Sequence, residues 1–260
     1  MSFKIIDAHM HLGASPDYLA VDQSLGTLLK VMDRLDIERA ISAHSLSLRD
    51  RYEEGIALDR QAHEASGGRI FSFFCYGPHH PQPALDAIRA HRAERVFRGI
   101  KLHPSGAFVD ADSELYRPAW EIARELKLPI LSHTWNVSSY HPSQKSAWAG
   151  KFEKYAAEYP DVTFVFGHSG GRYDGIVEAV RIGRAHKNCY FDIAGDIWDN
   201  GMLEYLIDNL GAERVLYGSD CYMIEQRPML GVVLGSSISD ADKEKILRHN
   251  ALKVYFADIG

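Results

Sequence analysis

The stretch Phe3-Lys4-Ile5-Ile6-Asp7-Ala8, followed at once by His9-Met10-His11, decides the fold. A short β-branched run that ends in polar side chains is typical of a buried strand with chemistry at its carboxyl end. Seven further runs of this kind follow along the chain. The eight predicted strands are Phe3–Ala8, Arg39–Ala43, Ile70–Tyr76, Phe97–Leu102, Pro129–Ser132, Val162–Gly167, Cys189–Ile193 and Val215–Ser219.

Segments with apolar residues at helical spacing separate the strands and follow the last one. They predict helices within Ser24–Leu35, Arg51–Ala65, Ala84–Arg92, Ser113–Leu126, Ala147–Glu158, Gly175–Ala185, Met202–Leu210 and Asp240–Phe256. Strict alternation implies parallel strands, because only a long crossover returns the chain to a parallel neighbour. Eight repeats predict a closed (β/α)₈ TIM barrel, a fold of about 250 residues. No linker or low-complexity tract interrupts the 260 residues, so we expect one domain over 1–260.

The composition excludes several classes of function. Twenty-nine basic against 35 acidic residues give a net charge of −6, which provides no basic field for nucleic acid or for an anionic membrane. No apolar run approaches the ~18 residues of a membrane span. Cys75, Cys189 and Cys221 lack zinc-finger spacing, and the N-terminus lacks the pattern of a signal peptide, so we expect a reduced, cytoplasmic setting. The expected partner is a small-molecule substrate; a homo-oligomer is left open.

The polar residues that carry chemistry follow the predicted strands. His9 and His11 are two residues apart, so in an extended segment both imidazoles point to one side. The other groups end later strands: Lys101 and His103 the fourth, His133 the fifth, His168 the sixth and Asp220 the eighth. In this barrel the active site lies at the C-terminal strand ends. Imidazoles with one carboxylate suit Zn²⁺ or another first-row divalent ion, which lowers the pKa of bound water.

A rival interpretation uses a serine nucleophile. Gly167-His168-Ser169-Gly170-Gly171 fits the G-x-S-x-G elbow, and Asp220 and His249 complete the chain order of an α/β-hydrolase triad with Ser169. This reading leaves His9 and His11 idle and places His249 inside a predicted helix. A serine hydrolase is therefore the less favoured hypothesis. His103 has two open readings, a substrate contact and an ordinary rim histidine.

Taken together, these motifs resemble the amidohydrolase superfamily of metal-dependent hydrolases, in the branch that also holds decarboxylases and lactonases. The resemblance covers the whole chain and rests on the order of its pieces: Ile6-Asp7-Ala8-His9-Met10-His11, Gly99-Ile100-Lys101-Leu102-His103-Pro104, Leu131-Ser132-His133, Phe166-Gly167-His168-Ser169-Gly170-Gly171, Tyr217-Gly218-Ser219-Asp220 and Asn250-Ala251-Leu252-Lys253-Val254-Tyr255-Phe256.

The resemblance implies a set of roles. His9, His11 and Asp220 would hold one metal ion, while His133 and His168 either hold a second ion or divide between ligand and acid/base duty. Lys101 would be a carboxylated bridge between two ions or a free amine, and both alternatives stay open.

The implied activity is hydrolysis of a small-molecule amide, lactone or ester by a metal-bound hydroxide. Asp220 would accept the water proton and, with His168, return it to the leaving group. The alternative is metal-dependent, non-oxidative decarboxylation of a small aromatic or unsaturated carboxylic acid. A barrel retained only as a metal-binding scaffold is a third, less favoured reading.

Overall fold

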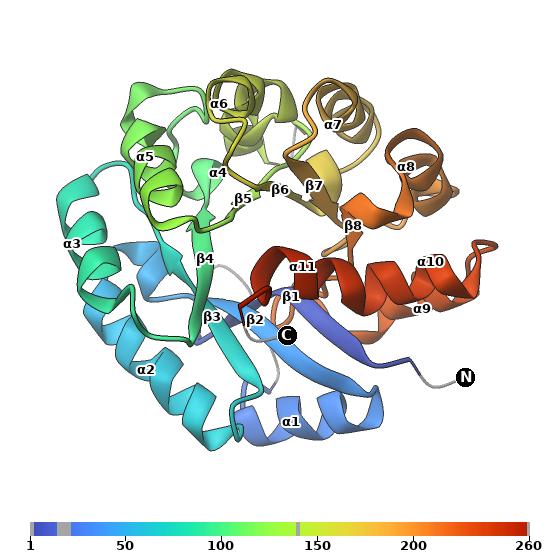
Figure 1. The fold of residues 1–260 in the computed structure, drawn as a ribbon, viewed down its shortest axis with the longest axis horizontal. Helices are drawn as coiled ribbons and strands as arrows, with labels where there is room; N and C mark the ends of the chain where they lie inside the picture. Colours follow the sequence, from blue (N-terminus) through green and yellow to red (C-terminus); the bar gives the residue numbers. More distant parts are fainter. Residues whose placement is uncertain (1–2, 15–21, 139–140, 259–260) are drawn as a thin grey trace.

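Eight parallel strands form the centre of the molecule, and helices surround them (Figure 1). The structure is a computed structural model that describes residues 3–14, 22–138 and 141–258. Each strand pairs in parallel with the next one along the chain, in the order β1 to β8. The strands are β1 Ile5–Leu12, β2 Ile37–His44, β3 Ile70–Cys75, β4 Phe97–Leu102, β5 Ile130–His133, β6 Phe164–Gly167, β7 Cys189–Asp192 and β8 Val215–Leu216. The predicted TIM barrel is confirmed.

The barrel is closed between its first and last strands by irregular backbone hydrogen bonds. Ala8 N donates to the carbonyl oxygen of Tyr217 at 3.0 Å, and Asp220 N donates to that of His9 at 2.9 Å. His11 N also donates to the carbonyl oxygen of Cys221. Closure through a turn rather than a regular ladder explains why β8 is only two residues long.

Two predicted strand ends were wrong by more than two residues, and the other ends agree within two. The first strand does not stop at Ala8: it continues through both histidines to Leu12, and His11 pairs with Ala43 of β2. A register shift between Asp7 and Met10 marks an extra residue on β1, which is a β-bulge. The prediction ended the strand before His9 because imidazoles are polar and interrupt the apolar run. In the structure, both imidazoles are as buried as the residues before them. The eighth strand stops at Leu216, because the chain turns there to pair with β1.

The helices lie outside the strands. The α-helices are α1 Leu25–Arg34, α2 Tyr52–Ala65, α3 Pro81–His91, α4 Pro104–Ala107, α5 Arg117–Leu126, α6 Glu153–Glu158, α7 Asp174–Ala185, α8 Met202–Leu210, α9 Arg227–Gly235, α10 Asp240–Glu244 and α11 Asn250–Tyr255. The 3₁₀-helices are η1 Ser47–Arg49, η2 Glu114–Tyr116, η3 Pro142–Ala147, η4 Ala149–Phe152, η5 His168–Gly170 and η6 Ala212–Arg214, and η7 Lys245–His249 is a π-helical turn. All eight predicted helical segments contain helix. Helix α9 was missed, because its run Gly231-Val232-Val233-Leu234-Gly235 resembles a strand in composition.

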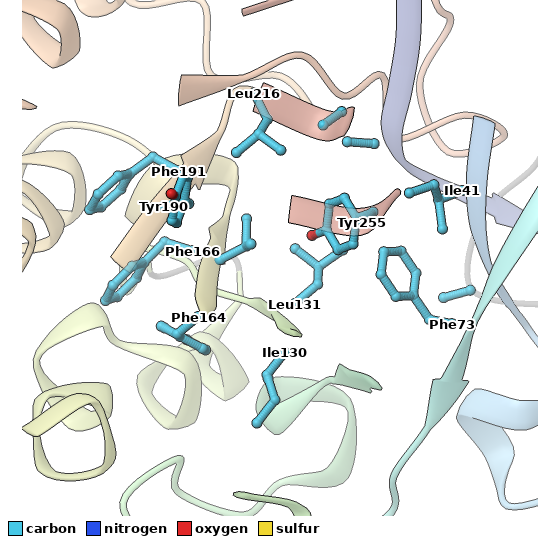
Figure 2. Close-up of a cluster of buried hydrophobic side chains, with 14 of the residues drawn as sticks. Ile41, Phe73, Ile130, Leu131, Phe164, Phe166, Tyr190, Phe191, Leu216 and Tyr255 are labelled. Atoms are coloured by element: carbon cyan, nitrogen blue, oxygen red, sulfur yellow. The ribbon is translucent and has the colours of Figure 1, made fainter. Parts of the chain in front are cut away.

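The core has two layers, one inside the barrel and one between the barrel and the helices. Figure 2 shows Ile41, Phe73, Leu131 and Tyr255 gathered inside the barrel. On the outer face, the rings of Phe164 and Trp120 of α5 pack with their centroids 5.1 Å apart. The two layers fix the strands on both faces.

Helix α11 covers the end of the barrel where the strands begin, and α10 lies to its side (Figure 1). Tyr255 packs on Phe73 of β3 with ring centroids 5.5 Å apart, and Phe256 packs on Phe71 at 4.9 Å. The opposite end, where the strands finish, is left for the site. Among the described residues, no helix has the length and apolar character to cross a bilayer.

Candidate active site

The residues predicted to carry chemistry meet at the C-terminal end of the barrel. His9 and His11 lie on β1, Lys101 on β4 and His133 at the end of β5, while His168 follows β6 and Asp220 follows β8. All six are buried. One ligand atom each of His9, His168 and Asp220 lies within 4.8 Å of the others. The predicted convergence is therefore found in the geometry, although the role of each residue stays a prediction.

Three imidazoles are held in one tautomer by hydrogen bonds behind them. Their Nδ1 atoms face acceptors: His9 Nδ1 lies 2.9 Å from Asp192 Oδ2, His11 Nδ1 3.2 Å from the carbonyl oxygen of Ala43, and His168 Nδ1 2.8 Å from that of Ala194. Carboxylate and carbonyl oxygens only accept, so each Nδ1 carries the hydrogen. Each Nε2 then presents a lone pair, which is the arrangement found in metal-bound histidines.

Asp220 faces these lone pairs with an oxygen that has no hydrogen-bond donor. Its Oδ1 lies 3.2 Å from His11 Nε2 and 3.8 Å from His9 Nε2. With both hydrogens on Nδ1, these contacts join acceptors to an acceptor, and Asp220 Oδ1 is a buried oxygen without a hydrogen-bond partner. Burial raises the pKa of Asp220, but the nearby His168, His11 and His9 outweigh burial and lower it.

His133 adds a fourth nitrogen beside this group. Its Nε2 lies 2.9 Å from Gln144 Oε1, which accepts the hydrogen, so Nδ1 keeps a lone pair. That Nδ1 lies 3.1 Å from His168 Nε2. Burial holds the pKa of His133 well below its usual range, and the neighbouring His103 lowers it further. Two lone pairs at this distance, together with the unpartnered Asp220 oxygen, fit a divalent cation held by imidazoles and a carboxylate.

Lys101 reaches the same place. Its Nζ lies 2.6 Å from His9 Nε2 and its side chain is fully buried. Burial lowers the pKa of the amine to about 8, although Asp220 and Asp192 raise it. The lysine thus places a titratable nitrogen against the lone pair of a predicted ligand, and the question of a carboxylated or free Lys101 stays open.

Asp192, at the end of β7, was missed by the sequence reasoning. Besides facing His9 Nδ1 through Oδ2, it accepts hydrogen bonds from the backbone N–H groups of His168 at 2.8 Å and Ala194 at 3.0 Å through Oδ1. One carboxylate therefore positions two imidazoles. Its position at the end of the seventh strand, between those that carry His168 and Asp220, was the available signal.

Asp7 positions the turn that carries Asp220. Its Oδ1 accepts from Ser219 N at 2.9 Å and its Oδ2 from Ser219 Oγ at 2.6 Å. Burial raises the pKa of Asp7 to about 6, although these hydrogen bonds lower it.

Gly195, in the loop after β7, leaves room for the imidazole of His168. Its φ is +90°, and a Cβ there would lie 2.8 Å from His168 Nδ1. Only glycine fits both that conformation and that space.

The serine nucleophile has little support from the geometry. Ser169 is fully buried, and its hydroxyl donates to the carbonyl oxygen of Asp192 at 2.7 Å. His249 is exposed in η7, and no hydrogen bond joins it to Asp220 or Ser169 within the part of the chain that the structure describes. The elbow motif here serves to turn the chain after β6.

A cavity of about 570 Å³ opens beside the site, over the ends of the first four strands. His11, His103 and Gln144 line it where it meets the buried groups, and Phe108 and Met223 line it as exposed apolar side chains. Arg227, which follows β8, forms an ion pair with Glu225 at 2.7 Å, and Arg172, which follows η5, pairs with Asp196.

Solved structures share this architecture at low sequence identity. An uncharacterized TIM-barrel protein from Bordetella bronchiseptica superposes with a TM-score of 0.77 at 15% identity, covering 96% of this chain and 97% of that chain. The 2,6-dihydroxybenzoate decarboxylase from Rhizobium gives 0.77 at 17% identity, covering 98% and 99%. A dihydroxybenzoic acid decarboxylase from Polaromonas sp. JS666, solved with bound manganese and 2-nitroresorcinol, gives 0.71 at 16% identity, covering 97% and 96%.

A comparison with the curated proteins found no match. The sequence itself matches one family model, described as amidohydrolase, over residues 6–257. That match covers the eight strands except for Ile5, the first residue of β1, and every residue of the site described above. The chain belongs to the amidohydrolase family and is an enzyme of the amidohydrolase superfamily.

Proposed function

We propose that this enzyme is a divalent-metal-dependent hydrolase that cleaves a C–N or C–O bond, in an amide, lactone or ester, of a small-molecule substrate. The observation that carries the proposal is the meeting of imidazole lone pairs with the unpartnered oxygen of Asp220 beside an open cavity. The Asp220 oxygen has no hydrogen-bond donor, and the lone pairs of His168 Nε2 and His133 Nδ1 face each other at 3.1 Å. Carboxylates and imidazoles are both ordinary ligands of first-row divalent ions.

Each residue has a role in this proposal. His9, His11, His168 and Asp220 would hold the ion, with zinc and manganese as the two candidates. When bound, such an ion polarises a carbonyl oxygen and lowers the pKa of water. Asp220 would accept the proton of the attacking water through its unpartnered oxygen. Asp220 would then return that proton to the leaving group, because His168 would bind the ion through Nε2 and donates its Nδ1–H to the carbonyl oxygen of Ala194, which leaves it no free nitrogen for the transfer.

Lys101 would contribute charge and hydrogen bonds. Its buried amine lies 2.6 Å from Nε2 of the proposed ligand His9 and can donate to a substrate oxygen. Asp192 would act behind the ligands, because its hydrogen bond to His9 Nδ1 fixes the direction of Nε2.

Decarboxylation of a small aromatic acid is the second candidate. A specific feature favours it: the rings of His103 and His133 stack within 10° of parallel with centroids 4.4 Å apart, and His133 is parallel to Trp135 within 10°. Flat rings of this kind suit a planar substrate. The decarboxylases from Rhizobium and Polaromonas share the fold and act, by their names, on dihydroxybenzoates.

The test compares two reactions on one metal-loaded preparation. The protein is stripped with a chelator, reloaded separately with Zn²⁺ and Mn²⁺, and assayed against aryl esters, lactones and amides and, in parallel, for CO₂ release from hydroxybenzoic acids. We expect hydrolysis that disappears on stripping and returns on reloading. CO₂ release without hydrolysis would replace the proposal by the second candidate. Hydrolysis that survives thorough stripping would refute metal dependence.

A further inference from the structure

The wall of the cavity over β4 is a short segment whose first residue is His103. This residue lies directly before the single helical turn α4. Its Nδ1 accepts a hydrogen bond from Gly106 N at 3.0 Å. A backbone N–H can only donate, so Nδ1 must carry a lone pair and the ring hydrogen must be on Nε2. The cap therefore fixes the tautomer of this imidazole.

Two further contacts fix where the ring points. One face of His103 stacks on His133, with centroids 4.4 Å apart and planes 10° from parallel. The α4 turn that follows His103 is also held to the loop after β3, because His79 Nε2 lies 2.8 Å from the carbonyl oxygen of Ala107. The ring can neither flip its nitrogens without losing the cap nor rotate without losing the stack.

The hydrogen bonds of His103 within the described residues all involve Nδ1, none involves Nε2, and His103 lines the cavity. His11, a predicted metal ligand, lines the same cavity. The same cavity is lined by Phe108, which follows α4 and is 77% exposed, and by Met223, which is 45% exposed. The cavity thus has a fixed neutral donor near the ligands and apolar side chains farther out.

We propose that His103 is a substrate-binding residue whose Nε2–H donates to a carboxyl or carbonyl oxygen of a small planar acyl compound, while the flat part of that compound packs against Phe108 and Met223. This inference deepens the proposed function, on which it rests, by naming planar acyl compounds as the substrate class.

The sharpest variant is His103→Asn. Asparagine is a favoured N-cap, so it keeps an acceptor for Gly106 N while removing the Nε2–H and the stacked ring. His80→Asn is the matched control. His80 also precedes a helix that begins with proline, α3, but its side chain makes no capping hydrogen bond, it is exposed and it does not line the cavity.

Binding is measured by calorimetry on the purified full chain with benzoate, benzamide and aniline as probes; only the first two carry an acyl oxygen. We expect His103→Asn to weaken benzoate and benzamide at least about tenfold, equivalent to ~1.4 kcal/mol. We expect aniline binding to change little, and His80→Asn to match the wild type for all three. Equal benzoate and benzamide affinities in His103→Asn and wild type would overturn the proposal, as would a parallel loss for aniline.

A measurement on the wild type covers the case in which His103→Asn does not fold. Long-range ¹H–¹⁵N NMR reports which imidazole nitrogen carries the hydrogen. We expect a protonated Nε2 for His103 that shifts when benzoate is added, and a protonated Nδ1 or an unmoved signal would overturn the proposal. Because neither readout needs turnover, failure of the hydrolase assay with intact His103-dependent binding would count against the proposed function alone.

Discussion

Replacing Asp59 by asparagine should change how the stability of this barrel depends on pH. Asp59 lies on α2, is completely buried, and faces the Ser42 and Ser72 hydroxyls of β2 and β3. These hydroxyls are 3.2 Å from each other, and neither forms a hydrogen bond of ordinary geometry with the carboxyl oxygens. Burial raises the pKa of Asp59 from 3.8 to about 8, and the two serines offset this only in part.

The sign of the effect follows from proton linkage. Between pH 4 and pH 8 the folded protein keeps the proton on Asp59 while the unfolded chain loses it. The unfolded state therefore binds fewer protons, and the free energy of unfolding falls as pH rises. Each pH unit in this window costs about 1.4 kcal/mol. From pH 5 to pH 8 the loss due to this one group is about 4 kcal/mol, and it levels off above the folded pKa.

The asparagine side chain in Asp59→Asn cannot ionise and has nearly the same volume as aspartate. The free energy of unfolding of the variant therefore does not fall through this group as pH rises. We expect the difference in free energy of unfolding, variant minus wild type, to rise by about 4 kcal/mol from pH 5 to pH 8. Urea unfolding followed by circular dichroism at four pH values gives this difference, in which the other titrating groups cancel. Asp208→Asn, an exposed change on α8, should give a flat difference. Parallel wild-type and Asp59→Asn curves would refute the assignment of a protonated buried carboxyl.

The other predictions concern the site. Asp220→Asn should lower kcat by a factor on the order of 10² to 10⁴ at normal metal content, because the amide cannot accept a proton; an unchanged kcat would remove Asp220 from the mechanism. Ser169→Ala should keep kcat within about threefold, and loss of activity in a folded variant would restore the serine hypothesis. Asp192→Asn should weaken metal affinity by about 10- to 100-fold in competition with a chelator, whereas equal affinity would show that His9 needs no orienting partner. Lys101→Ala should lower the metal count from two towards one if the lysine is a carboxylated bridge, or leave one ion and raise KM if it is a free amine; two ions retained without the lysine would contradict both.

The barrel could be predicted from the sequence because its signal is repeated. Eight apolar runs at similar intervals each support the same topology, so an error at one end changes little. The predicted strand boundaries were wrong where hydrogen bonding, and not the residue composition, determines where a strand ends. His9 and His11 are polar yet lie within β1, and Ser219 looks like strand yet lies in a turn held by Asp7. Periodicity reports burial, and it does not report which backbone group a chain segment will pair with.

The convergence of the candidate site residues could be predicted, but the direction of their imidazole nitrogens could not. Strand ends of a parallel barrel meet at one face, so His9, Lys101, His168 and Asp220 had to lie near one another. Whether an imidazole presents Nδ1 or Nε2 depends on acceptors in other strands, such as the carbonyl oxygen of Ala194 for His168. Asp192 was missed for the same reason, since its importance lies in two long-range contacts and in no local motif.

Backbone geometry shows what the site requires of the rest of the fold. His168, Ser169 and Asp220 have φ values of +62°, +49° and +65°, in the left-handed region that costs an ordinary residue about 1 kcal/mol or more. Hydrogen bonds from other strands hold two of them there, from His168 N to Asp192 and from Asp220 N to His9. These bonds exist only when β1, β7 and the turn after β8 are already in place. The end of the barrel that carries the candidate site is therefore determined by tertiary structure, while the opposite end, packed under the C-terminal helices, supplies the apolar contacts that hold those strands together.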